Sequence, residues 1–173
     1  MGTTKVLDLR SVFGLQARVT TSSRETGGAY VEMDVTADPG AGVTPHSHRG
    51  QEESYQVLEG TLEVLRDGSW STLRSGESLT VPPDAVHAFR NPTNAPARFL
   101  NVHRPALQFE DHLTAVDRLV REGKVRGMND PRSLIYLSMS AAKYRPDVQV
   151  KPPQWVISGM ALLGRALGFK LQG

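Results

Sequence analysis

Residues 40–60 read GAGVTPHSHRGQEESYQVLEG and contain two histidines, His46 and His48, separated by one residue. In a β-strand, alternate side chains point to the same face, so both imidazoles can reach one ion. After the following turn, Glu53 has the parity of the inward-facing positions of the next strand, whereas Glu52 has the opposite parity. The segment therefore predicts two His ligands and one Glu ligand on the inside of a β structure.

A second segment, residues 76–91, reads GESLTVPPDAVHAFRN. Gly76 and the pair Pro82-Pro83 are turn signals on either side of a short strand. The turn that follows delivers His87 onto another strand. His87 is thus the fourth candidate ligand, converging with the first segment on one point.

The two segments resemble the two motifs of the cupin superfamily. Residues 40–60 match every defining position of the first motif with its spacing, namely Gly40, His46, His48, Glu53 and Gly60. Residues 76–91 match the second motif at Gly76, Pro82, His87 and Asn91, with Asp84 where the family usually has Gly. Because Asp tolerates left-handed turn conformations, this departure is compatible with the fold.

The resemblance implies an all-β fold, a cupin barrel (a double-stranded β-helix, similar to a jelly roll), and a homodimer. It also implies that His46, His48, Glu53 and His87 bind one divalent transition metal. Imidazole and carboxylate donors suit Fe, Mn, Ni, Cu, Co or Zn, and four ligands leave one or two coordination positions open. A dication with one carboxylate keeps a net charge of about +1, which favours a small anionic ligand.

For the reaction, the resemblance to quercetin dioxygenase-like cupins implies a metal-dependent dioxygenase or related oxidoreductase acting on a small enolisable or phenolic anion. Glu53 is expected to move a proton as well as to bind the metal. Tyr55 has the same strand parity as Glu53 and is expected to hydrogen-bond a substrate, with core packing as the alternative. A metal-dependent isomerase or lyase, and a non-catalytic small-molecule or metal-binding module, are the alternative functions.

The chain divides into a predicted barrel, residues 1–106, and a predicted helical extension, residues 107–173. Before the boundary, apolar and polar residues alternate, as in GAYVEMDVTA at residues 28–37, and Asp67-Gly68 is a strong hairpin signal. After it, helical spacing predicts helices near residues 109–123, at 130–143 and after Pro152-Pro153. The third helix carries an apolar stripe of Val156, Met160, Leu163 and Leu167. We expect the extension to pack on the barrel or on a dimer partner.

Composition limits the other functions. The 173 residues contain no cysteine, so thiolate metal sites and cysteine nucleophiles are excluded. The formal net charge is only +2, and the basic residues of the C-terminal third are scattered through helical patterns rather than clustered, which predicts no nucleic-acid binding. The first ten residues lack the apolar run of a secretory signal, and no stretch is long enough to span a membrane. The sequence therefore predicts a cytoplasmic protein that binds no membrane.

Overall fold

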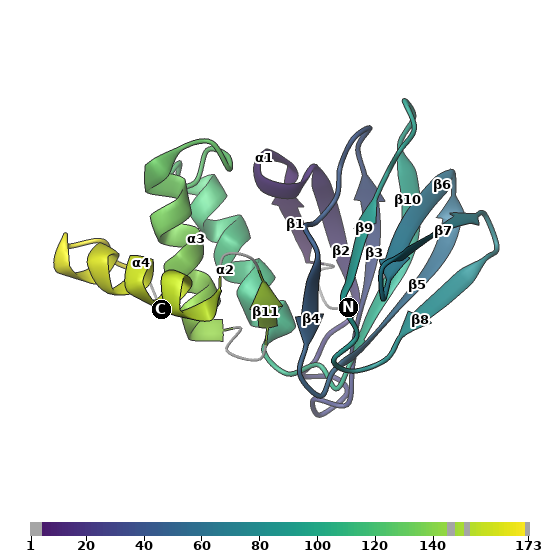
Figure 1. The fold of residues 1–173 in the computed structure, drawn as a ribbon, viewed down its shortest axis with the longest axis horizontal. Coiled ribbons are helices and arrows are strands. Elements are labelled where there is room, and N and C mark those ends of the chain that lie inside the picture. Colours follow the sequence, from purple (N-terminus) through teal and green to yellow (C-terminus); the bar gives the residue numbers. More distant parts are fainter. Residues whose placement is uncertain (1–4, 145–147, 151–152, 172–173) are drawn as a thin grey trace.

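A computed structural model describes residues 5–144, 148–150 and 153–171 of the chain. Two antiparallel β-sheets face one another and enclose a shared core (Figure 1). The first sheet has the order β1-β2-β3-β10-β5-β8 and the second the order β11-β4-β9-β6-β7. The strands are β1 (Val6–Leu9), β2 (Leu15–Thr21), β3 (Val31–Ala37), β4 (His46–His48), β5 (Glu52–Glu59), β6 (Thr61–Arg66), β7 (Ser69–Arg74), β8 (Ser78–Val81), β9 (His87–Arg90), β10 (Ala97–Arg104) and β11 (Val148–Val150). The predicted all-β barrel is confirmed.

The turns follow the signals in the sequence. Asp67 and Gly68 adopt φ values of 49° and 85° and connect β6 to β7 in a two-residue hairpin. Asp84 adopts φ 66°, the left-handed conformation that its place in the second motif requires. Its backbone N–H donates to the carbonyl of His48 at 2.9 Å, which ties this turn to the strand that carries two of the candidate ligands.

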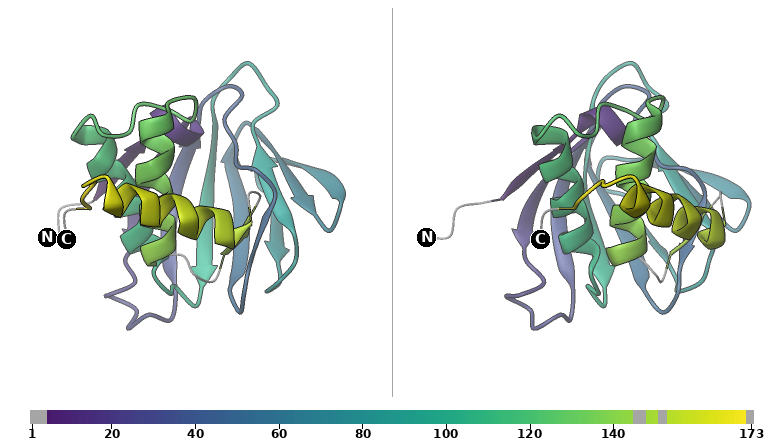
Figure 2. Two further views of the ribbon diagram at one scale, coloured as in Figure 1. Left: turned by 60° about the vertical axis from the view of Figure 1, so that its left-hand side comes forward. Right: turned by 90° about the vertical axis from the view of Figure 1, so that its left-hand side faces the viewer.

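The predicted C-terminal helical extension is confirmed, and it covers one open side of the two sheets (Figure 2). It consists of α2 (Phe109–Arg121), α3 (Pro131–Tyr144), β11 and α4 (Gln154–Ala166), whereas the short α1 (Arg10–Phe13) belongs to the barrel. Val116 of α2 is fully buried in the barrel core. The backbone N–H of Asp8 in β1 donates to Asp117 at 2.7 Å, and Glu110 accepts from Ser23 and Lys5. The extension is therefore seated on the barrel of its own chain through α2.

The predicted apolar stripe on the third helix does not pack as a whole within this chain. In α4 the buried positions are Ile157, Ala161 and Gly164, whereas Leu163 and Leu167 are 52% and 62% exposed. The reason is close helix packing, because a Cβ at Gly164 would lie 2.5 Å from a side-chain carbon of Ile135 in α3. Gly164, which has no side chain, therefore lies directly against α3.

Trp155, near the start of α4, is 76% exposed in this chain. None of the helices in the described residues has the length and apolar character needed to cross a membrane.

Asp34 on β3 forms a charged network on the outer side of the first sheet. It accepts from Arg98 at 2.7 and 2.9 Å and also pairs with Arg18, while only 6% of Asp34 is exposed. The hydrogen bonds from Arg98, together with Arg18, lower the pKa of Asp34 below its ordinary 3.8 in spite of burial. The charged form of Asp34 is therefore favoured in the folded protein.

We expect Asp34→Asn to lower the free energy of unfolding at pH 7 by about 1–2 kcal/mol. The expected loss is this small because both arginines are partly exposed, so solvent screens their attraction to Asp34. Because the pKa of Asp34 is lowered on folding, its contribution is complete above pH 3.8 and is lost as the pH falls through the lower folded value. Urea unfolding at several pH values measures this. Glu59→Gln is the control, because Glu59 contacts Arg98 from a position 69% exposed and should change little. Equal stability of Asp34→Asn and the unsubstituted protein at pH 7 would contradict the prediction.

Candidate metal centre

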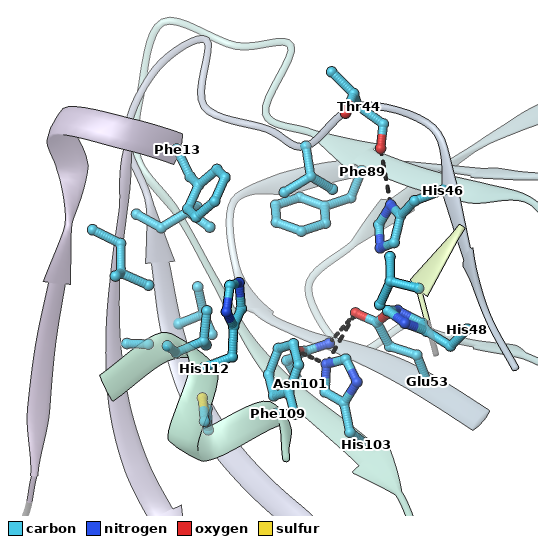
Figure 3. Close-up of a pocket in the computed structure, with 18 of the residues that line it drawn as sticks. Phe13, Thr44, His46, His48, Glu53, Phe89, Asn101, His103, Phe109 and His112 are labelled. Atoms are coloured by element: carbon cyan, nitrogen blue, oxygen red, sulfur yellow. Dashed lines mark hydrogen bonds and ion pairs between the residues drawn. The ribbon is translucent and has the colours of Figure 1, made fainter. Parts of the chain in front are cut away.

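The four predicted ligands come together at one end of the barrel interior. Strand β4 supplies His46 and His48, β5 supplies Glu53 and β9 supplies His87, which is paired in register with His46. One potential donor atom from each of the four lies within 4.8 Å of the others. Glu53 is 3% exposed and faces inward, as strand parity predicted, and Figure 3 shows it beside His48 and below His46.

Hydrogen bonds fix two of the imidazole rings. The Nδ1 atoms of His46 and His87 lie 2.9 Å from the backbone carbonyls of Thr44 and Ala85. Because a carbonyl only accepts, each Nδ1 carries a proton, which leaves Nε2 as the nitrogen that can bind a metal. Burial lowers the pKa of His46 to about 3, so this ring is neutral at physiological pH. A neutral ring held in this way is ready to ligate a metal through Nε2.

The carboxylate of Glu53 lies at the centre of the group. Its Oε2 is 3.1 Å from Nε2 of His48 and 2.9 Å from Nε2 of His87. Burial by itself would raise the pKa of Glu53, but the neighbouring His103 and the hydrogen bonds from His48 and His87 hold it well below the ordinary value. Glu53 is therefore an anion buried among nitrogen donors.

This donor set fits a divalent transition metal. Three imidazoles and one carboxylate suit Mn, Fe, Co, Ni, Cu or Zn, whereas Mg²⁺ and Ca²⁺ prefer oxygen donors. The buried carboxylate supplies one negative charge, whereas a dication would carry two positive charges. The four side chains thus form a candidate metal centre that would remain net positive.

Asn101 and His103 on β10 hold the second oxygen of Glu53. Asn101 donates from Nδ2 to Glu53 Oε1 at 2.9 Å, and its Oδ1 lies 2.9 Å from Nε2 of His103. The other nitrogen of His103 lies 3.2 Å from Oε1 of Gln51, whose amide donates to the carbonyls of Pro105 and Ala106. His103 also stacks on Phe109, the first residue of α2, with ring centroids 3.5 Å apart. His103 thus connects Glu53 to the start of the helical extension and is not one of the four donors.

Tyr55, predicted to hydrogen-bond a substrate, is 1% exposed and does not border the cavity described below. Its ring packs against Phe89 and Phe99, with centroids 5.7 and 6.0 Å away. Burial and the nearby charge of Glu53 raise the pKa of Tyr55 well above 10, so it stays a phenol. Within the described part of the chain, its hydroxyl has no hydrogen-bond partner of ordinary geometry. The alternative expectation of core packing describes this side chain better.

A cavity of about 220 Å³ opens beside the donors (Figure 3). The barrel lines it mainly with apolar side chains, among them Phe13, Met33, Phe89 and Phe99. The extension completes the wall, and its contribution includes Phe109, His112, Leu113, Ala141, Val148, Gln154 and Ile157. His112 lies in this wall because of the way α2 docks on the barrel. The candidate metal centre therefore lies at one side of an apolar pocket built by both parts of the chain.

Comparison with known proteins supports the fold of the barrel. Residues 33–103 match the family model of the cupin domain. The chain resembles a solved RmlC-like cupin from Shewanella frigidimarina NCIMB 400, with 25% identity and a TM-score of 0.52, over 60% of this chain and 86% of the other. A predicted oxalate decarboxylase from Thermotoga maritima shares the fold at 21% identity, with a TM-score of 0.53, over 60% and 92% of the two chains.

Two curated relatives are similar in sequence. Polyketide synthase CurC from Streptomyces cyaneus is 40% identical over 62 residues, which are 36% of this chain and 40% of the relative. Mannose-1-phosphate guanylyltransferase from Escherichia coli K12 is 30% identical over 100 residues, 57% of this chain and 21% of the relative. The chain thus spans about a fifth of the guanylyltransferase and two fifths of the polyketide protein.

Proposed function

Because the chain carries a cupin domain and belongs to the cupin superfamily, we propose that it is a metal-dependent enzyme, a dioxygenase or related oxidoreductase for a small enolisable or phenolic anion. The observation that carries this proposal is the meeting of four metal-type donors, His46, His48, Glu53 and His87, at the side of an apolar cavity. Such a cavity with a few convergent polar groups is the usual form of a small-molecule site.

A divalent transition metal held by these four residues would supply Lewis acidity and one or two open positions for an anionic oxygen. The protein supplies the rest. The apolar walls keep water away and so strengthen the attraction between the site and an anion. Asn101 holds one oxygen of Glu53, which leaves the other facing the histidines. Glu53 is also the buried carboxylate placed to hold a proton released by an enol or phenol.

The likeness to a relative named a polyketide synthase supports the substrate class. Polyketide chains carry carbonyl groups on alternate carbons, and the carbons between them enolise readily. An enolate or the phenol that forms from it is a small oxygen anion of the kind that a net positive site attracts. We do not extend the nucleotidyl transfer of the guanylyltransferases to this chain, because the match covers about a fifth of the E. coli protein.

The test is elemental analysis of the purified protein, followed by an oxygen electrode with phenolic and 1,3-dicarbonyl compounds. We expect bound Mn, Fe, Co, Ni or Cu and oxygen uptake that stops when the metal is removed by a chelator. Turnover of the same compounds without oxygen uptake would favour an isomerase or lyase, in which the ion polarises a carbonyl. Metal binding without any turnover would favour a non-catalytic binding protein. We also propose that two copies associate, which ultracentrifugation tests.

A further inference from the structure

The cavity has one polar region formed by the barrel and another formed by the extension. The barrel contributes three of the four donors, His46, His48 and Glu53, whereas α2 contributes His112. In Figure 3 His112 stands on the opposite side of the pocket from His46 and His48. Its Nδ1 lies 3.1 Å from Oγ of Ser140 in α3, and this contact orients the ring within the wall. A ligand in this pocket would therefore meet polar groups at two separate places.

Between these two regions the walls are aromatic and aliphatic. Phe89 from the barrel is drawn between His112 and His46 (Figure 3), and Phe13 from the barrel and Phe109 from the extension also line the cavity. Phenyl rings pack well against the faces and edges of other rings. Glu53 is the one acidic residue in the described lining, so the apolar walls carry no charge that would repel an anion.

The size of the cavity limits the ligand. At about 220 Å³ it exceeds the ~150 Å³ of an apolar cavity that admits benzene. It is smaller than the ~300–1,000 Å³ of pockets for drug-sized molecules. A ligand of one or two rings fits these limits, and a molecule of four fused rings does not.

On the basis of the proposed function, we infer that the substrate is a flat molecule of one or two rings, with an anionic oxygen at the metal and a second polar group hydrogen-bonded by His112. The helical extension is then part of the binding site, and His112 determines specificity. Gln154 of α4 also lines the cavity. We assign the recognition to His112, because α2 is anchored by the buried Val116 and the ring itself is held by Ser140.

The inference is tested by calorimetric titration with two probes that differ in one hydroxyl, 1,5-dihydroxynaphthalene and 1-naphthol. We expect both compounds to bind the protein. His112→Leu should lower the affinity for the dihydroxy compound roughly tenfold, about the value of one hydrogen bond. The affinity for 1-naphthol should change little. His112→Gln, which keeps a hydrogen-bonding group, should recover part of the loss. Gln154→Leu is the matched control and should affect the two probes equally.

Equal affinities of the unsubstituted protein and His112→Leu for the dihydroxy probe would overturn the inference, and so would failure of both probes to bind. An equal loss of affinity for both probes in His112→Leu would also overturn it, since His112 would then be only a part of the wall. Metal content is measured on the same samples. If no metal is bound but the difference between the probes still depends on His112, the proposed metal chemistry fails, whereas the assignment of His112 as the specificity residue stands.

Discussion

Protein carrying His48→Ala is expected to lose nearly all of its bound metal on purification, because one of four donors is removed from a buried site. Alanine has no atom that can bind a metal. A water molecule in the space left by the His48 ring would not replace the imidazole beside Glu53. The loss of affinity should exceed the roughly 10–100-fold that removal of an outer hydrogen-bond partner costs. Elemental analysis after dialysis, followed by titration with Co²⁺ and its visible spectrum, measures both content and affinity.

Two further variants calibrate this result. Asn101→Leu removes the hydrogen-bond donor that holds Oε1 of Glu53 but leaves all four ligands in place. Its affinity for the metal should therefore fall by about 10–100-fold, less than in His48→Ala. Glu52→Gln alters the adjacent carboxylate, which lies outside the four-residue group, and should leave metal binding unchanged. Equal metal content in His48→Ala and the unsubstituted protein would refute the metal centre.

Removal of residues 107–173 is expected to make the barrel aggregate. The deletion takes away Val116 from the core and uncovers the surface around β1, where Leu7 and Leu9 are each 1% exposed. Burial of each such side chain contributes about 1.5–3 kcal/mol, so the loss of several is comparable with the whole stability of a domain. Light scattering and thermal unfolding of the truncated and full-length chains measure the effect.

A point variant separates this packing from other effects of truncation. Val116→Asp places a charge in the core, and we expect it to lower the free energy of unfolding by about 3 kcal/mol or more. Asp111→Asn, on the exposed side of the same helix, should change stability by about 0.5 kcal/mol or less. A truncated chain that stays soluble and unfolds at the full-length temperature would show that the extension is not needed for stability.

The barrel and its four donors were accessible from sequence because their geometry is local. A strand has a period of two, so the spacing of His46 and His48 and the parity of Glu53 decide which side chains face inward. Asp84 illustrates the same point, since the turn needs only a residue that tolerates positive φ. The spacing of the two motifs then relates His87 to the other three.

The extension was predictable as helices but not as part of the pocket. Helical periodicity located α2 and α3 to within two residues, yet it gives no information on which side meets the barrel. For α4 the apolar stripe does not coincide with the side that packs within this chain, because Gly164 permits an approach that large residues prevent. The place of His112 in the wall depends on contacts between residues far apart in sequence, and hydrophobic pattern does not encode them.

Strand β11 has a consequence for how copies of this chain can meet. It pairs antiparallel with β4 from a position about a hundred residues later in the sequence, and it stands at the outer end of the second sheet. An uncovered β4 would offer free backbone N–H and C=O groups to a strand of another molecule. With β11 in place, continuous sheets between copies cannot form through the strand that carries two candidate ligands. Among the described strands, association by strand pairing would therefore use β1, β8, β7 or β11, the outermost strands of the two sheets, and would leave the metal-binding end of β4 inside its own chain.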